Sequence, residues 1–290
     1  MGSAIATNLL SRGFEVHAFN RTQEKTKPIK EKGGIIHSTT KELASAVEIV
    51  ITSLTDENVV EQVAFVEDGG FVSNINKNGG VWIEMSTIDP DATAKFAERA
   101  RSLGASKLDV PIVGAPQFEL EGKAVLLAGG SKDLFQKNES FLNQLGNPVM
   151  YLGPDGSGSR MKLVVNLYMG LIAESFSEAF TFSEKLGFKP DDFVRVLNNT
   201  PHRNFVSQVK GPKIAAGDFE PAFSMNNLLK DLRLAKKQAD KVNAVLPVSN
   251  IVIQEFTKAV ELGEGNKDFS AVALEIELIN GLLEKSGSRH

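Results

Sequence analysis

The sequence contains no cysteine, and its four histidines, His17, His37, His202 and His290, are widely scattered. Without cysteine the chain has no disulfide, no thiol nucleophile and no thiolate metal ligand. The histidines show no metal-ligand spacing, so we expect chemistry without a metal. The beginning of the sequence also lacks the charged and apolar regions of a signal peptide, and we expect a cytoplasmic protein.

Neither sign of charge dominates the chain. Its formal net charge is -4, and its basic residues are spread along the sequence rather than grouped. This distribution gives no reason to expect nucleic acid or an anionic membrane surface as a partner. No stretch has the roughly 18 continuous apolar residues of a membrane span. With 290 residues, of which 42% are hydrophobic, the chain can bury one large core or, more readily, two smaller ones.

The first half of the sequence alternates short β-rich stretches with amphipathic helical ones, which is typical of a parallel α/β sheet. Asp89 and Pro90 stand where a helix cap and a first-turn residue would be, ahead of a helix over 90–104. The strands are expected in 14–19, 47–54, 81–85, 105–110, 124–129 and 148–153, with helices in 40–46 and 58–65. After residue 159 the periodicity is helical throughout, so an all-α region follows.

The α/β region starts on a helix, over residues 1–13, rather than on a strand. Gly2 lies where the third glycine of a G-x-G-x-x-G turn would be, and the next strand ends about 18 residues later, at the usual ribose-reading position. We therefore expect Met1 and Gly2 to lie at a dinucleotide site. The first strand and the first two glycines are missing, and we expect a truncated or misassigned start.

A helix predicted over 157–180 is apolar on nearly every side, and we expect it to be buried. Lys162 and Asn166 are its strongly polar side chains between Met161 and Ala173, and their spacing of four places them on one face. A buried ammonium needs a partner or a function. The alternative is a lysine whose amine reaches solvent from a partly exposed helix.

Four stretches occur in an order that resembles the β-hydroxyacid dehydrogenase family. They are "MG...NLLSRGFEVHAFNRT", "DVPIVGAP", "GSGSRMKLVVNL" and "LLKDLRLA", and together they extend the resemblance over nearly the whole chain. The resemblance implies a Rossmann-type NADP-binding domain over 1–155. It also implies a helical substrate and oligomerisation domain over 156–290, beginning with the long inter-domain helix. The activity implied is hydride transfer between NAD(P) and a short hydroxy acid or the matching aldehyde or keto acid, in a homodimer or homotetramer.

The resemblance also implies roles for particular residues. Lys162 matches the family's catalytic lysine, which exchanges a proton with the substrate oxygen. Asn166 matches an amide that bonds either this lysine or the substrate. Lys230 would reach the cofactor, Asp231 would orient or balance charge near Lys162, and Phe223 would form an apolar wall. For Lys230 and Asp231 the alternative is an ordinary surface pair on a helix.

Two regions of the α/β part bear on the cofactor. Leu54 and Thr55, and then Thr87, follow strands at the edge where nucleotides bind such sheets, although helix capping would also explain polar residues there. Asn20, Arg21 and Thr22 stand where an NAD-selective site usually has a carboxylate, and Arg21 can bind a 2'-phosphate. This favours NADP over NAD; the alternative is a solvated helix start.

The turn 111–115 departs from the family pattern. The family usually has a serine in a P-V-S-G-G-like turn that binds the substrate carboxylate, and Val113 occupies that position here. Gly114 and Ala115 still offer backbone N–H groups, so we expect weakened carboxylate binding. Two rival functions stay open: a non-catalytic dinucleotide-binding scaffold, and an imine reductase on the same fold, which the retained Lys162 disfavours.

Overall fold

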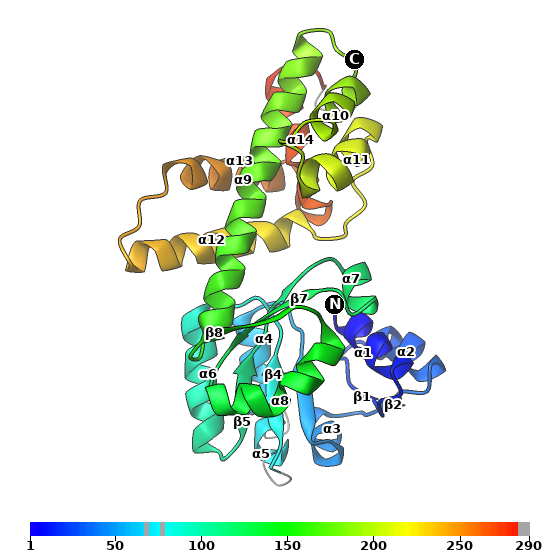
Figure 1. The fold of residues 1–290 in the computed structure, drawn as a ribbon, viewed down its shortest axis with the longest axis vertical. Coiled ribbons are helices and arrows are strands. Elements are labelled where there is room, and N and C mark those ends of the chain that lie inside the picture. The colour runs from blue at the N-terminus through cyan, green and yellow to red at the C-terminus, as the bar shows by residue number, and fades with distance from the viewer. Residues whose placement is uncertain (67–69, 76–78, 284–290) are drawn as a thin grey trace. The chain divides into compact units, whose positions relative to one another are not determined.

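The computed structural model describes residues 1–66, 70–75 and 79–283 of the chain. Its contacts divide the chain into two compact units, Met1–Lys162 and Leu163–His290. The first unit is an α/β structure and the second is built from helices, as Figure 1 shows. This is the α/β and all-α arrangement that the sequence pattern predicts.

The strands of the first unit form two sheets. β1 (His17–Ala18) and β2 (Ile35–Ile36) pair in parallel in a sheet of their own. The second sheet has the order β3-β4-β5-β7-β6, with β8 paired to β7. Its strands are β3 (Ile49–Thr52), β4 (Val81–Glu84), β5 (Ser106–Asp109), β6 (Ile112–Val113), β7 (Val125–Gly129) and β8 (Val149–Gly153). In the part of the chain that the structure describes, β1 and β2 pair with each other and not with β3.

Each predicted strand stretch contains a strand, but the expected all-parallel sheet is wrong in one place. β7 runs antiparallel to β5 and to β6, whereas β3, β4 and β5 are parallel to one another and β8 is parallel to β7. The connection from β6 to β7 contains only the short helix α7 (Pro116–Leu120). It is too short for the crossover that a parallel return requires, so the chain turns back on itself.

The helices of the first unit cover both faces of the larger sheet. α6 starts as predicted, because Asp89 accepts a hydrogen bond from the backbone N–H of Asp91 at 3.0 Å and Pro90 is the first helical residue. The helices besides α7 are α1 (Gly2–Ser11), α2 (Lys27–Glu31), α3 (Thr40–Ala46), α4 (Glu57–Glu61), α5 (Val72–Ile75), α6 (Pro90–Ser102) and α8 (Lys132–Leu145).

Two apolar clusters form the core of the first unit, one on each face of the sheet. Alternation along β4 sends Trp82 into one cluster and Ile83 into the other. Trp82 packs with Phe96 of α6, and Ile83 lies in the cluster that also contains Ile5 of α1. α1 thus packs apolar side chains against the sheet.

The second unit has one core, formed by helices that begin with the remainder of α9 (Ser157–Lys185). Phe176 and Phe180 of α9 pack there with Leu228 and Leu232 of the facing helix, and Gly170 allows that helix to approach. The other helices are α10 (Pro190–Asn198), α11 (Gly211–Ala216), α12 (Met225–Lys241), α13 (Pro247–Glu261) and α14 (Val272–Ile279).

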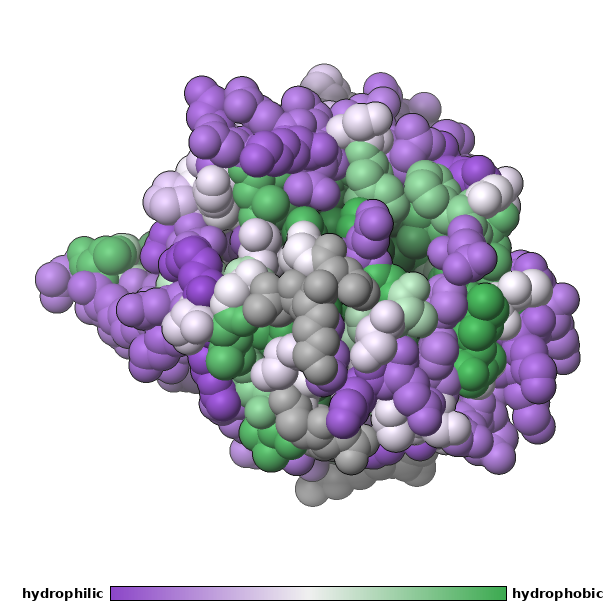
Figure 2. Space-filling model, turned by 90° about the horizontal axis from the view of Figure 1, so that it is seen from below, coloured by the Kyte–Doolittle hydropathy of each residue, from purple (hydrophilic) through white to green (hydrophobic). Residues whose placement is uncertain are grey.

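The expectation that α9 is buried on nearly every side is wrong. Val164 is 58% and Tyr168 61% exposed, because a single helix turns only part of its circumference toward its neighbours. Apolar side chains also reach the surface between hydrophilic ones on the face drawn in Figure 2. Within the described residues, α9 is the one helix whose length and composition would allow a membrane span, and 44% of its most apolar window is buried in the protein.

Candidate active site

A buried hydrogen-bond network joins the two loops at the carboxyl ends of β3 and β4. Glu84 accepts hydrogen bonds from the Thr52 hydroxyl and from the backbone N–H of Ser86, each at 2.7 Å. The Ser86 hydroxyl in turn accepts a bond from the backbone N–H of Leu54 at 2.7 Å. The predicted cofactor loops, containing Leu54 and Thr87, are therefore held together through Glu84 and Ser86.

The residues between these loops and α4 serve partly as a helix cap. Asp56 accepts a hydrogen bond from the backbone N–H of Val59 at 3.0 Å, and the hydroxyl of Thr55 donates to Asp56 at 3.0 Å. Thr55 is exposed and Thr87 is half-buried. Asp56 is thus the residue of this loop that caps α4. Leu54 and Thr55 lie at the sheet edge.

Met1 and Gly2 lie at the start of α1, which has no side-chain cap. A Cβ on Gly2 would lie 3.9 Å from Cβ of Ser53, so the helix start is next to the loop after β3. Asn8 of the same helix donates a hydrogen bond to the carbonyl of Glu119 at 2.9 Å. Glu119 is fully buried, and burial raises the pKa of its carboxyl to about 7.

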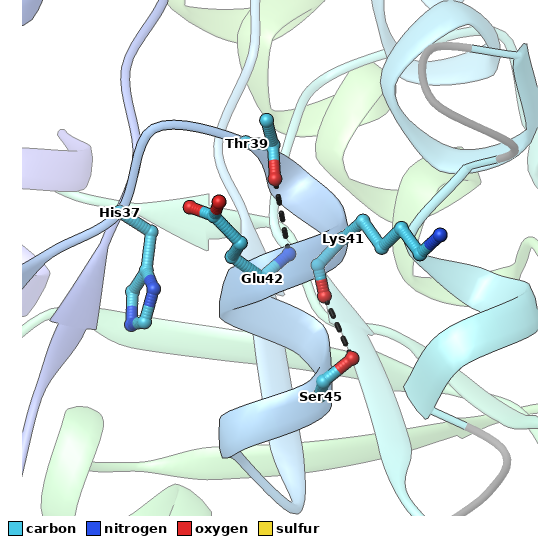
Figure 3. Close-up of a pocket in the computed structure, with 5 residues that line it drawn as sticks. All are labelled: His37, Thr39, Lys41, Glu42 and Ser45. Carbon is cyan, nitrogen blue, oxygen red and sulfur yellow. Dashed lines mark hydrogen bonds between the residues drawn. The ribbon is translucent and has the colours of Figure 1, made fainter.

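Asn20, Arg21 and Thr22 are exposed after β1, where Asn20 accepts a hydrogen bond from the backbone N–H of Thr22 at 2.9 Å. They do not line the open hollow of about 920 Å³ nearby, which lies against the start of α3. Figure 3 shows the residues that line it, which are His37, Thr39, Lys41, Glu42 and Ser45. There Thr39 caps α3 by accepting a hydrogen bond from the backbone N–H of Glu42 at 3.1 Å.

The predicted carboxylate turn begins at the end of β6. Val113 is half-buried and pairs with Val125 of β7. Gly114 has φ 153°, a value that L side chains rarely adopt, and Ala115 is the N-terminal cap residue of α7. The turn therefore has the backbone geometry of a tight bend, with an isopropyl group in place of a hydroxyl.

In the second unit the structure brings three predicted residues together. Asn166 of α9 donates a hydrogen bond to Asp231 of α12 at 2.6 Å, and both residues are buried. The ammonium of Lys230 lies 3.1 Å from the other carboxylate oxygen of Asp231. The amide N–H₂ group of Asn166 thus donates to Asp231, and the expected bond of Asn166 to Lys162 or to the substrate stays a prediction. Asp231 is therefore no surface residue, and the surface-pair alternative fails for it.

Lys162 lies in the second turn of α9 and is half-buried. Ser159 lies three residues before it and Asn166 four residues after it, so these three residues share one face of the helix. Both flanking residues are buried and hydrogen-bonded, Ser159 to Asp109 and Asn166 to Asp231. The amine thus belongs to a stretch of α9 whose position is fixed by polar contacts on the same face.

Phe223 is half-buried in the segment that leads into α12. Its backbone N–H donates to Asp268 at 3.3 Å, as does that of Ala222 at 3.1 Å. The ammonium of Lys210 bonds the same carboxylate at 2.8 Å, and both charged residues are buried. This pair holds the segment that carries Phe223 to the rest of the second unit.

Sequence reasoning missed Glu84, Asp109, Lys210 and Asp268, all of which are buried ionisable residues. The sequence did offer a sign of Glu84 and Asp109, since each is a carboxylate at the end of a strand that is otherwise apolar or buried. Their long-range partners lie between 32 and 58 residues away in the sequence, so these pairings could not be deduced. Among the described residues, no three His, Asp or Glu side chains are placed to hold a metal ion.

Comparisons with known proteins match both parts of the chain to described families. A family model described as the NAD-binding domain of 6-phosphogluconate dehydrogenase matches residues 1–153. A second, described as the NAD-binding region of NADP-dependent 3-hydroxyisobutyrate dehydrogenase, matches residues 156–276.

Two relatives and one solved structure show how far the similarity extends. The chain is 33% identical to glyoxylate/succinic semialdehyde reductase 1 of Arabidopsis thaliana, over 94% of this chain and 93% of that protein. It is 30% identical to 2-(hydroxymethyl)glutarate dehydrogenase of Eubacterium barkeri, over 99% and 95%. The structure of 3-hydroxyisobutyrate dehydrogenase from Salmonella typhimurium shares the fold with a TM-score of 0.86 at 22% identity, covering 94% of this chain and 95% of that one.

The α/β unit, with its nucleotide-binding sheet edge, and the helical unit define a nicotinamide-dependent oxidoreductase. The chain belongs to the β-hydroxyacid dehydrogenase family, whose members are NAD(P)-dependent hydroxyacid dehydrogenases and reductases. Its residues fit a nicotinamide dinucleotide. The start of α1 has no side-chain cap that would compete for its N–H groups, and it adjoins Ser53 at the carboxyl edge of parallel strands.

Proposed function

We propose that the protein is an NADP-preferring hydroxyacid dehydrogenase or semialdehyde reductase with Lys162 as its general acid and base. The substrate would be a short β-hydroxy acid or the corresponding semialdehyde or keto acid. The observation that carries this proposal is the place of the half-buried residue Lys162, on the same helix face as the buried bond between Asn166 and Asp231.

A bound nicotinamide dinucleotide would supply the hydride for reduction or accept it in oxidation. In the reductive direction Lys162 gives a proton from its ammonium to the carbonyl oxygen, on which negative charge develops. In the oxidative direction its neutral amine takes the hydroxyl proton. Asp231, with its negative charge next to Lys230 and Asn166, keeps the polar groups of α9 and α12 in fixed orientations.

Arg21 supports the preference for NADP, because no carboxylate lies among Asn20, Arg21 and Thr22 to repel a 2'-phosphate. We predict that Arg21→Ala weakens binding of NADPH by roughly 10-fold or more, the value of a charged hydrogen bond, and of NADH by much less. Fluorescence titration with both cofactors measures this difference. Lys30→Ala, an exposed basic residue of α2, is the control. Equal losses for NADPH and NADH would show that Arg21 does not read the phosphate.

Val113 bears on the substrate. We predict that Val113→Ser improves kcat/KM for acidic aldehydes by roughly 10- to 100-fold, because a hydroxyl restores a hydrogen bond to the carboxylate at similar side-chain volume. A neutral aldehyde of similar length is the control and should gain nothing. If serine helps neither class or both equally, the carboxylate binds elsewhere.

A homodimer or homotetramer, and a cytoplasmic location, also belong to this proposal. Exposed apolar side chains of the helical unit, such as Val164, Tyr168 and Ile251, support association between copies of the chain. Sedimentation velocity would measure the number of subunits.

The proposal is tested by following NADPH oxidation with glyoxylate and with succinic, malonic and methylmalonic semialdehydes. We expect turnover with at least one of them, and less with a cyclic imine. A chain that binds NADPH but reduces none of the aldehydes would support the non-catalytic alternative, and one that reduces only the imine would support an imine reductase.

A further inference from the structure

The first turn of α9 is fixed to the end of β5 by Asp109. One carboxylate oxygen of Asp109 accepts a hydrogen bond from the backbone N–H of Ser159 at 2.9 Å, and the other accepts one from the Ser159 hydroxyl at 2.7 Å. The N–H groups of a first helical turn have no acceptor within their own helix. Asp109 therefore acts as the cap of α9 from a distant strand.

Close packing also constrains this turn. A Cβ on Gly158 would lie 2.2 Å from the carbonyl oxygen of Leu127, so the helix backbone lies directly against β7. Asp109, Ser159 and Thr93 are all at most 1% exposed, and the hydroxyls of Thr93 and Ser159 are 3.4 Å apart.

A positively charged residue lies near Asp109 on the same strand. Lys107 lies two residues earlier on β5 and is 2% exposed. Burial raises the pKa of the Asp109 carboxyl, while the positive charge of Lys107 and the bonds from Ser159 oppose this rise. A carboxylate at a helix N-terminus is also favoured by the helix dipole.

Ser159 precedes Lys162 by three residues, so Asp109 holds the helix on the face that carries the amine and one turn before it. We propose that Asp109 is a positioning residue for the reaction, which sets the place of Lys162 by fixing the first turn of α9. This inference rests on the proposed role of Lys162. A displacement of 1 Å in a reacting group can lower turnover by about 100-fold, so a modest release of this turn has a measurable effect.

The test compares Asp109→Asn, Asp109→Ala and Ser159→Ala with the parent protein. We expect Asp109→Ala and Ser159→Ala to lower kcat by roughly 10-fold or more while the Kd of NADPH changes less than threefold. Asp109→Asn keeps an acceptor for the backbone N–H of Ser159 and should retain more of kcat than Asp109→Ala. Ser177→Ala is the matched control, because Ser177 is another fully buried serine of α9, and its hydroxyl donates within the helix to the carbonyl of Ala173.

Amide hydrogen exchange supplies a readout that does not depend on catalysis. Exchange of residues 159–163 should become faster in Ser159→Ala and stay unchanged in Ser177→Ala. If exchange accelerates and kcat is unchanged, Asp109 fixes the helix but does not position the reaction, and the inference is overturned. Unchanged exchange in this turn overturns it as well. If Asp109→Ala does not fold, Ser159→Ala and Asp109→Asn decide. Full activity of Lys162→Met would refute the proposed function, whatever the exchange data show about Asp109.

Discussion

Two buried glutamates, one in each unit, are held in opposite ways. Glu84 of β4 is fully buried, and each of its carboxylate oxygens accepts a hydrogen bond, from Thr52 and from Ser86. Glu174 of α9 is 5% exposed, and neither of its oxygens has a hydrogen-bond partner among the described residues. Burial alone therefore does not define the role of a carboxylate. Glu84 joins two loops through its hydrogen bonds, whereas Glu174 is buried without any among the described residues.

The charges around Glu84 and Glu174 also differ in sign. Burial raises the pKa of both carboxyls, but for Glu84 the positive charge of Lys107 and the two hydrogen bonds oppose the rise. For Glu174 burial is reinforced by the negative charges of Glu255, Glu178 and Glu275, and its pKa rises to about 8. Glu84 thus has a positive charge and hydrogen bonds around it, whereas Glu174 lies among charges of like sign.

The largest change in the free energy of unfolding is expected from Glu84→Ala. It leaves the N–H of Ser86 without its acceptor and creates a cavity, so we predict a loss of about 3 to 5 kcal/mol in the free energy of unfolding. Trp82, the single tryptophan of the sequence, donates to the Thr52 hydroxyl at 2.7 Å, so its fluorescence reports unfolding at this place. The exposed Glu98→Ala on α6 is the control and should change stability by less than about 0.5 kcal/mol. Similar values for both variants would show that the network does not stabilise the unit.

Glu174→Gln is expected to stabilise the protein, by less than Glu84→Ala destabilises it. Since its folded-state pKa of about 8 lies above its ordinary value of 4.5, the folded protein binds more protons than the unfolded chain between these pH values. The stabilisation by this group is complete below about pH 4.5 and is lost as the pH rises through 8. We predict that Glu174→Gln is about 1 to 3 kcal/mol more stable than the parent at pH 8.5, with little difference near pH 5.

Thermal unfolding of the two proteins from pH 5 to 9 measures this difference. Glu275 shares the same cluster and its pKa is raised to about 7, chiefly by burial, so part of the pH dependence should persist in the variant. Glu261→Gln, an exposed residue of α13, is the control. A Tm of Glu174→Gln that follows the parent at every pH would contradict the account of this cluster.

The positions of helices and strands could be predicted from the sequence where they depend on a local pattern. The apolar stretches over 81–85 and 124–129 contain β4 and β7, and Asp89 with Pro90 marks the start of α6. Two-residue strands such as β2 and β6 leave no periodicity to detect, and the direction of β7 follows from its short connection to β6. α9 was located by its composition, but its exposed side could not be foreseen, because exposure depends on which helices surround it.

The candidate site was predicted as a set of residues rather than as a set of contacts. The spacing of Lys162 and Asn166 placed them on one helix face, yet the bond of Asn166 to Asp231 joins residues 65 apart. The bonds of Glu84 to Thr52 and of Asp109 to Ser159 depend on strand register and helix packing in the same way. Such pairings are tertiary, so the sequence identifies the participants without showing which of them meet.

The role of Lys162 is the central claim, and single-turnover reduction by Lys162→Met tests it most directly. Methionine keeps the length and apolar character of the side chain and removes the acid, so the account predicts an unchanged Tm, a Kd for NADPH within about threefold of the parent, and a rate of hydride transfer lower by roughly 100-fold or more. Lys185→Met, at the far end of the same helix, should keep the parental rate. A rate for Lys162→Met within threefold of the parent would contradict the account.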